Sequence, residues 1–259
     1  MGPGEAVAIL AAGAAAGAVN AVVGSGSLIT FPTLLAFGYA PVVANVSNNV
    51  GLVSGNISGA VGYRRELAGQ KRRLIRLSAF AVAGSIGGAA ALLSLPSSSF
   101  KLIVPVLILI ACVLVFVQPR LSARIAARRA EAAAANGDAP RERTSPVLAA
   151  GVVGSAAYGG YFGAAQGVLV IGLLGSFLDE PLQRVNAAKN VLVAIVNGTA
   201  AIVYIIFAHV AWLVVLLIAI GSTLGGLVGA RYGRRLPPVV LRIFIVLIGV
   251  ISAVKLIFF

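Results

Sequence analysis

The chain has 259 residues, of which 59% are hydrophobic and only 10% are charged, and its mean hydropathy is +1.02. A soluble domain is about 45–50% apolar and about 25% charged, so a water-soluble fold of this length could not bury so much apolar surface. The same surplus excludes a disordered chain, which needs low hydrophobicity. The composition therefore predicts an all-α integral membrane protein with several spans.

The charges narrow the range of partners. Lys and Arg number 20 against 7 Asp and Glu, for a net charge of +13. A soluble protein with this balance would suggest nucleic acid. Here, however, the positive residues form short blocks between apolar runs, and such blocks normally face the cytoplasm and its anionic inner leaflet. We therefore expect a lipid bilayer as a partner, and no nucleic acid.

The residues that carry most catalytic and metal chemistry are scarce. The chain has one Cys and one His, so neither an internal disulfide nor a Cys/His metal site is expected. No Walker A sequence occurs, and no Ser/His/Asp constellation can be assembled around a single His. We therefore expect no cofactor, no metal and no enzyme activity.

The first half of the chain contains five apolar segments. They cover residues 6–23, 27–39, 42–63, 77–95 and 99–117. A membrane span needs about 20 apolar residues, so the second segment is too short to cross a bilayer alone. The breaks that isolate it are glycine-containing, and a basic block separates the third segment from the fourth.

A polar linker and five more apolar segments follow. The linker covers residues 118–145, and its middle, near 121–135, is interpreted as a short amphipathic helix on the membrane surface. The later segments are expected at 147–162, 165–178, 187–208, 211–230 and 239–258. The predicted domains are a first membrane repeat (1–117), a cytoplasmic basic linker (118–145) and a second membrane repeat (146–259).

The two halves repeat each other. Shifting the first half by 141 positions places Gly26 on Gly167 without a gap. Matches of Ala, Val and Leu would arise by chance in this composition, whereas three Asn and one Tyr in register indicate a duplication. These matches pair Asn45, Asn49, Asn56 and Tyr63 with Asn186, Asn190, Asn197 and Tyr204.

The basic blocks indicate that the second repeat is inverted. In the first half the block lies between the third and fourth segments, and in the second half it lies between the fourth and fifth. Positive loops normally face the cytoplasm, so the same unit would cross the membrane in opposite directions. We expect a multi-pass cell-membrane protein with linker 118–145 in the cytoplasm and both termini outside. The first two segments of each half are either two full passes or two broken or re-entrant half-helices, and the shortness of 27–39 favours half-helices.

The two glycine-rich breaks are the candidate binding site. Inverted repeats with interrupted helices commonly bind their substrate where the breaks meet. Glycine permits unwinding, and the free amides at a helix start suit an anion. Alternatively, these glycines only let helices pack closely. The candidate substrate-binding residues are Gly24, Ser25, Gly26, Ser27, Asn49, Ala165, Gln166, Gly167, Lys189 and Asn190.

The Asn residues and Lys189 refine this interpretation. Buried amides must be paired, so Asn56 and Asn197, in the middle of their segments, are interpreted as structural hydrogen-bonding residues. Asn49 and Asn190 lie nearer the starts of their segments and are better placed to reach the breaks. Lys189 is either the positive charge that attracts an anion or a lysine that snorkels to the interface.

Two stretches resemble a known family. Gly24-Ser-Gly-Ser-Leu-Ile-Thr-Phe-Pro32 and Ala44-Asn-Val-Ser-Asn-Asn49, together with the duplicated halves, resemble the sulfite exporter TauE/SafE family, also called the 4-toluene sulfonite uptake permease family. The resemblance covers nearly the whole chain, but the second break, Gly163–Gly167, lacks a counterpart of Pro32.

The resemblance implies a secondary transporter, expected to export sulfite, sulfoacetate or related organosulfonates, with a small anion as its partner. Three alternatives stay open. They are a channel or carrier for another anion or a neutral metabolite, a subunit of a membrane complex, and a membrane-embedded enzyme. Assembly as a homodimer is a further alternative that stays open.

Cysteine labelling tests the inverted topology. A membrane-impermeant thiol reagent added outside should label cysteines introduced near Ser98 and His209, because both loops are expected to be extracytoplasmic. The same reagent should miss cysteines near Gln70 and Asn136. Labelling at Gln70 from outside would contradict the inversion.

Overall fold

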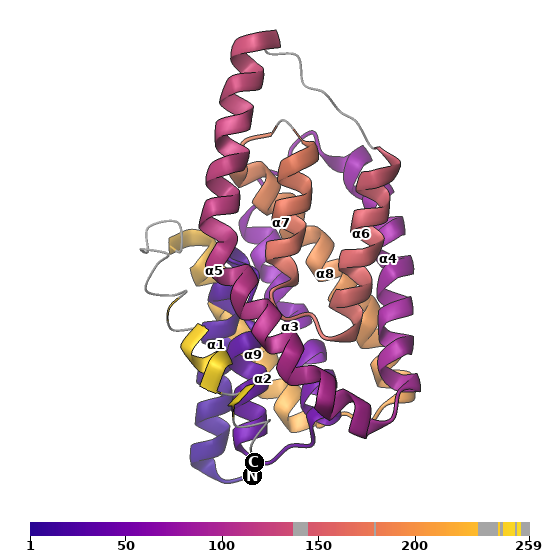
Figure 1. Cartoon of the computed structure of the whole chain (residues 1–259). Coiled ribbons are helices and arrows are strands. Elements are labelled where there is room, and N and C mark those ends of the chain that lie inside the picture. The colour runs from indigo at the N-terminus through magenta and orange to yellow at the C-terminus, as the bar shows by residue number, and fades with distance from the viewer. Residues whose placement is uncertain (137–144, 179, 233–242, 244–245, 252, 255–259) are drawn as a thin grey trace.

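The computed structural model describes residues 1–136, 145–178, 180–232, 243, 246–251 and 253–254. The regular structure of these residues is helical, which confirms the expected all-α class (Figure 1). The first half contains α1 (Pro3–Val22), α2 (Ser27–Ala36), α3 (Pro41–Gly62), α4 (Lys71–Ser94) and α5 (Ser97–Asn136). The second contains α6 (Pro146–Tyr161), α7 (Gln166–Phe177), α8 (Leu182–Phe207) and α9 (Trp212–Tyr232).

Several of these helices are long and apolar enough to span a bilayer. By length and composition they are α1, α4, residues 102–120 of α5, α8 and α9. The shorter α2 and α7 have 10 and 12 residues, so neither reaches the length of a span. The chain is therefore a multi-pass membrane protein in which each half contains one short apolar helix.

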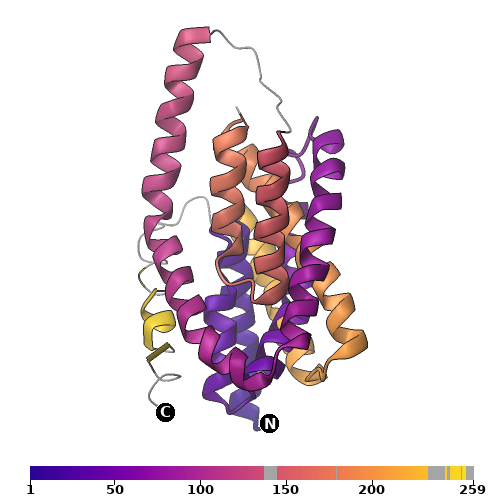
Figure 2. The ribbon, with the colours of Figure 1, turned by 45° about the vertical axis from the view of Figure 1, so that its right-hand side comes forward.

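Two helix boundaries differ from the sequence expectation. Helix α4 begins at Lys71 rather than near residue 77, because its first turns are basic and extend beyond the apolar segment. Helix α5 continues to Asn136 (Figure 2). The prediction of a separate surface helix near 121–135 is therefore wrong. That stretch is rich in Ala and Arg, which favour helix, and nothing ends the helix at residue 117. Most of the last expected segment, 239–258, lies outside the described residues.

The fourth helix of each half packs against the other half. Helix α4 packs mainly on α6 and α8, whereas α9 packs mainly on α1 and α3. Helices α3 and α8 contact each other between these groups. The contacts of α4 with α6 and α8 correspond to those of α9 with α1 and α3, as a duplicated sequence would produce. The orientation of the two halves in the membrane stays a prediction.

Small residues allow these helices to approach closely. A Cβ added to Gly88 of α4 would lie 1.9 Å from the carbonyl oxygen of Ala157 on α6. A Cβ added to Gly17 of α1 would lie 2.1 Å from the carbonyl oxygen of Ser222 on α9. Such contacts are typical of membrane helices, whose association depends on backbone approach rather than on the hydrophobic effect.

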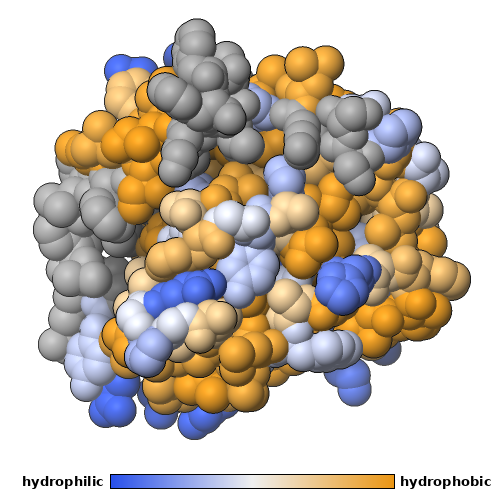
Figure 3. Space-filling view, turned by 90° about the horizontal axis from the view of Figure 1, so that it is seen from below, coloured by the Kyte–Doolittle hydropathy of each residue, from blue (hydrophilic) through white to orange (hydrophobic). Residues whose placement is uncertain are grey.

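The periphery of the bundle is apolar. Large hydrophobic side chains such as Phe116, Phe207 and Trp212 are exposed on the isolated chain. In the view from the end at which α1 begins, apolar residues form most of the rim, and the hydrophilic areas are small (Figure 3). This surface suits contact with lipid tails and not with water.

Alanine substitutions in α4 test the close packing. Gly88→Ala should lower the free energy of unfolding by about 1–3 kcal/mol, because overpacking forces α4 and α6 apart. Gly87→Ala is the matched control, since a Cβ there meets no atom within 4 Å and the helix propensity gained is the same. The measurement is thermal unfolding in detergent. Equal effects of the two substitutions would contradict this packing.

Candidate functional site

The two breaks lie in direct contact. The backbone amide of Gly167 donates a hydrogen bond of 3.1 Å to the carbonyl of Gly24. Gly24 has a φ of +87°, and a Cβ on it would lie 2.5 Å from the Cα of Gly167. Only glycine fits both the left-handed backbone and the close approach at this position. The glycines therefore allow both the unwinding of the helix and the close packing, which were considered above as alternatives.

Polar side chains of α8 bind the end of α1. The side-chain nitrogen of Lys189 donates to the carbonyl of Asn20 at 2.7 Å. The amides of Asn186 and Asn190 donate to the carbonyl of Ala21, at 3.2 Å and 3.3 Å. The last four carbonyls of a helix have no partner within the helix and carry partial negative charge. Helix α1 can therefore end at Val22, inside the protein, without unpaired acceptors at these positions.

The other half has a similar but uncharged arrangement. The amide of Asn45 donates to the carbonyl of Tyr161, at the end of α6, over 3.0 Å. Asn48, the counterpart of Lys189, accepts a hydrogen bond from the hydroxyl of Thr30. Of these two equivalent positions, one therefore holds a lysine that contacts the end of α1, and the other holds a neutral amide that contacts α2.

Two pairs of hydrogen-bonded asparagines lie near the first break, Asn20 with Asn56 and Asn49 with Asn197. The carboxamide oxygen of Asn20 accepts from the amide of Gly26 at 2.6 Å, and its nitrogen donates to Asn56 at 3.2 Å. Asn49 donates to Asn197 over 3.4 Å, which joins α3 to α8. Sequence reasoning missed Asn20, although it is the only polar side chain between residues 6 and 23.

Several buried polar atoms in this region have unused hydrogen-bonding capacity. Buried polar groups in proteins are almost always paired, so unpaired ones are expected to meet a water molecule or a ligand. Within the described part of the chain, the atoms without a protein partner include Ser25 Oγ, Asn49 Oδ1, Asn56 Nδ2, Asn186 Oδ1, and both Oε1 and Nε2 of Gln166.

Four backbone amides at the two breaks already have protein acceptors. Gly24 donates to Val19, and Gly26 to Asn20. Gln166 donates to Gly163, and Gly167 to Gly24. The structure thus brings the candidate residues of the two breaks together, but leaves the donors of their side chains, and not these amides, for a ligand. Ser27 lies in the first turn of α2 and is half-buried.

An ionic cluster joins the two halves at one end of the bundle. The Glu180 carboxylate, between α7 and α8, pairs with Arg184 and lies 3.2 Å from the buried Arg73 of α4. Gln70 donates to the carbonyl of Arg184 at 3.2 Å. Burial raises the pKa of Glu180, but hydrogen bonds and charges from Arg184 and Arg73 outweigh it and hold the pKa below its ordinary value.

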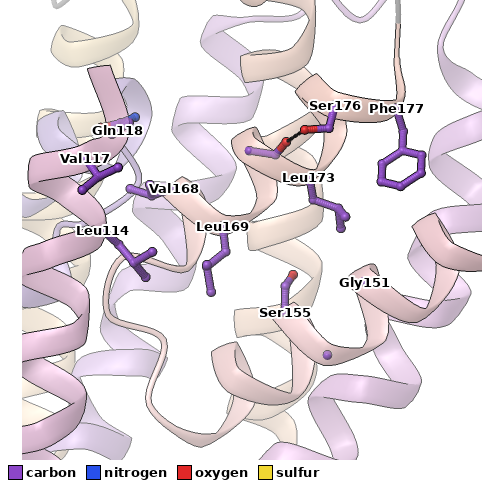
Figure 4. A pocket seen from close by; sticks show the side chains of 12 residues that line it. Leu114, Val117, Gln118, Gly151, Ser155, Val168, Leu169, Leu173, Ser176 and Phe177 are labelled. Atoms are coloured by element: carbon purple, nitrogen blue, oxygen red, sulfur yellow. Dashed lines mark hydrogen bonds between the residues drawn. The ribbon is translucent and has the colours of Figure 1, made fainter. Parts of the chain in front are cut away.

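A pocket of about 500 Å³ lies beside the breaks rather than at them. It is bounded by α5, α6 and α7 (Figure 4), and its lining is mostly apolar, with Leu114, Leu173 and Phe177 as its larger side chains. Gln118 of α5, at its inner edge, donates to the carbonyl of Val23 at 3.5 Å. The pocket lining lacks the lysine and most of the unpaired donors that gather at the breaks, so it does not match the anion site that the sequence predicts.

Groups able to hold a metal ion are absent from the described residues, which contain no cluster of three or more His, Cys, Asp or Glu side chains. The site is therefore built from amides, hydroxyls, backbone carbonyls and one ammonium.

The sequence matches the family described as Sulfite exporter TauE/SafE over residues 9–256. The chain belongs to this family. It is 24% identical over 249 residues to the probable membrane transporter protein YfcA of Escherichia coli K12, which covers 94% of this chain and 86% of the relative.

Two further relatives have similar names. The chain is 24% identical over 243 residues to a probable membrane transporter protein of Haemophilus influenzae, covering 93% of this chain and 89% of the relative. It is 23% identical over 246 residues to one from Sinorhizobium, covering 93% and 88%. No solved structure is significantly similar to the chain. This TauE/SafE protein is therefore a membrane transporter by family.

Asparagine substitutions test the structural hydrogen bonds. Asn56→Ala and Asn197→Ala should each lower the free energy of unfolding by about 1–2 kcal/mol, because each leaves the amide of Asn20 or Asn49 buried without an acceptor. Ser94→Ala, at an exposed position, should change it little. Melting curves in detergent provide the comparison. Unchanged melting temperatures for both Asn variants would refute a structural role.

Proposed function

We propose that this TauE/SafE protein is a secondary transporter that exports small sulfur-containing anions, such as sulfite, sulfoacetate or another organosulfonate. The anion binds where the two breaks meet. The observation that carries this proposal is the juxtaposition of the buried Lys189 ammonium with breaks whose Ser25 and Gln166 side chains lack partners. Family membership supports the transporter class, and the family's description supports sulfur.

The charges of the chain support an anionic substrate. The seven acidic residues are Glu5, Glu66, Glu131, Asp138, Glu142, Asp179 and Glu180, so none lies within α2, α3, α7, α8 or α9. Lys189 therefore has no carboxylate counter-ion from these helices, and a ligand anion would neutralise it. Ionised side chains within membrane segments are rare and usually functional.

The donors of the site suit an anion that must also be released. A sulfonate or sulfite offers three oxygens, and hydrogen bonds to a charged acceptor are about twice as strong as neutral ones. Modest bonds from Ser25 Oγ and Gln166 Nε2 would bind such a group without the strength of a bidentate arginine clamp. Transport requires binding that is strong enough for entry and weak enough for release.

The direction of transport and the orientation of the chain in the membrane are parts of the same proposal. Export follows the family's description, and the displaced basic blocks support a cytoplasmic linker at 118–145 with both termini outside. The ionic cluster of Arg73, Glu180 and Arg184 would then lie at the cytoplasmic end, beside the anionic leaflet.

A carrier for another small anion is the second candidate, because one ammonium and neutral donors do not by themselves select three oxygens over a halide. Purified protein in liposomes, tested with sulfite, sulfoacetate, taurine, sulfate and chloride, separates the two. We expect transport of sulfite or an organosulfonate. Transport of chloride alone would favour the second candidate, and release of a chemically altered product would indicate an enzyme.

Substitutions at the breaks locate the site. Gln166→Ala and Ser25→Ala should weaken binding by about one to two decades, because each removes a hydrogen bond of about 1.5–3 kcal/mol to a charged partner. Ser176→Ala is the control, since its hydroxyl donates within α7 to the carbonyl of Gly172 at 2.8 Å. Normal transport by Gln166→Ala, Ser25→Ala and Lys189→Ala together would show that the site lies elsewhere.

A further inference from the structure

We propose that Lys189 also carries a proton, so that each anion crosses the membrane together with one proton that binds the Lys189 amine. The inference rests on the proposed function, because the anion site is the same. It assigns the coupling ion, which neither the family nor its relatives' names provide.

The Lys189 side chain is buried and uses only part of its hydrogen-bonding capacity. Lys189 is only 1% exposed, and its single hydrogen-bond partner among the described residues is the carbonyl of Asn20. An ammonium has three donors and needs an acceptor for each. Two donors are therefore available to oxygens of a bound anion, and they are unsatisfied when the anion is absent.

Few ionisable side chains belong to the helices that pack around Lys189. Helices α3 and α7, which pack on α8, contain no Asp, Glu, Lys, Arg, His, Cys or Tyr. Helix α1 has only Glu5, in its first turn at the far end, and the basic residues of α4 lie in its first turns. Helix α6 contributes Tyr158 and Tyr161. On α8 itself the ionisable side chains are Arg184, which is paired with Glu180, and Tyr204.

The consequence is that protonation and anion binding depend on each other. A buried charge without a counter-ion is costly, so the empty site favours a neutral amine that needs no anion. A proton taken from water onto the Lys189 nitrogen turns it into an ammonium, and the arriving anion neutralises that charge. On the other side the anion leaves, the nitrogen–hydrogen bond breaks, and the proton returns to water. One proton and one anion have then moved in the same direction.

The duplication supports a special role for this one position. Asn48, its counterpart, cannot carry a proton at neutral pH, and it already accepts a hydrogen bond from Thr30. The two halves are therefore equivalent in their packing but not in their capacity for charge. A merely structural residue at the end of α1 could be an amide, as Asn186 and Asn190 are on the adjacent carbonyl.

The test measures proton movement with the anion in liposomes. Full-length protein is reconstituted with a pH-sensitive dye inside, the membrane potential is clamped to zero, and sulfoacetate is added outside at equal pH. Both acidic groups of sulfoacetate are ionised near neutral pH, so the substrate itself carries no proton. We expect the lumen to acidify with one proton for each anion taken up, and sulfoacetate uptake without acidification would overturn the proposal.

Two variants distinguish proton transport through Lys189 from a leak of protons across the liposome membrane. Lys189→Arg keeps a charge that is not lost in proteins, so net sulfoacetate uptake and luminal acidification should both fall at least tenfold. Arg184→Lys, on the same helix, is the control and should keep both activities. Acidification by Lys189→Arg at the wild-type rate would overturn the proposal.

The experiment separates a failure of the proposed transport function from a failure of proton coupling. If the wild-type protein exchanged none of sulfite, sulfoacetate and taurine, the sulfur-anion function would be wrong. If exchange occurred without any change of luminal pH, the function would stand, and proton coupling through Lys189 would be wrong. The wild-type measurement decides the question even if Lys189→Arg does not fold.

Discussion

The hydrogen bond between the amide of Gly167 and the carbonyl of Gly24 is the contact on which the centre of this protein depends. In a bilayer, backbone polar groups can leave a helix only where other protein groups or an aqueous cavity satisfy them. Two breaks that touch each other satisfy part of that need directly. The close approach in turn requires glycine at both positions, and it brings the first turn of α7 beside the end of α1.

The remaining acceptors at the broken end explain why polar residues gather on α8. Lys189, Asn186 and Asn190 supply donors to carbonyls that a continuous helix would have paired internally. Lys189 has two further donors, which the anion of the proposed function would use. A substitution there would then change both the structural support and the binding of that anion. Measurements of folding are therefore needed beside every transport assay of these residues.

The packing of each fourth helix on the other half holds the two breaks between the repeats. Because α4 packs on α6 and α8 while α9 packs on α1 and α3, each break is held between helices that belong to both repeats. The contacts use glycines and short side chains, so the helices meet along backbone surfaces. At one end, the Arg73–Glu180–Arg184 cluster adds charged contacts between the halves. At the other, Ser47 accepts a hydrogen bond from the amide of Ala211.

The sequence by itself determined the membrane class, the helical segments, the two breaks and the duplication, because composition, apolar length and residue type are local properties of the chain. The Asn residues and Lys189 were recognisable for the same reason, since polar groups are costly in apolar segments. Only the tertiary structure decided that Lys189 contacts the carbonyl of Asn20, that Asn20 belongs to the cluster, and that four of the break amides are already paired. Those facts depend on how the chain folds at each break and on which helices meet there, and the contacts of Lys189 with Asn20 and of Gly167 with Gly24 join residues more than 100 positions apart.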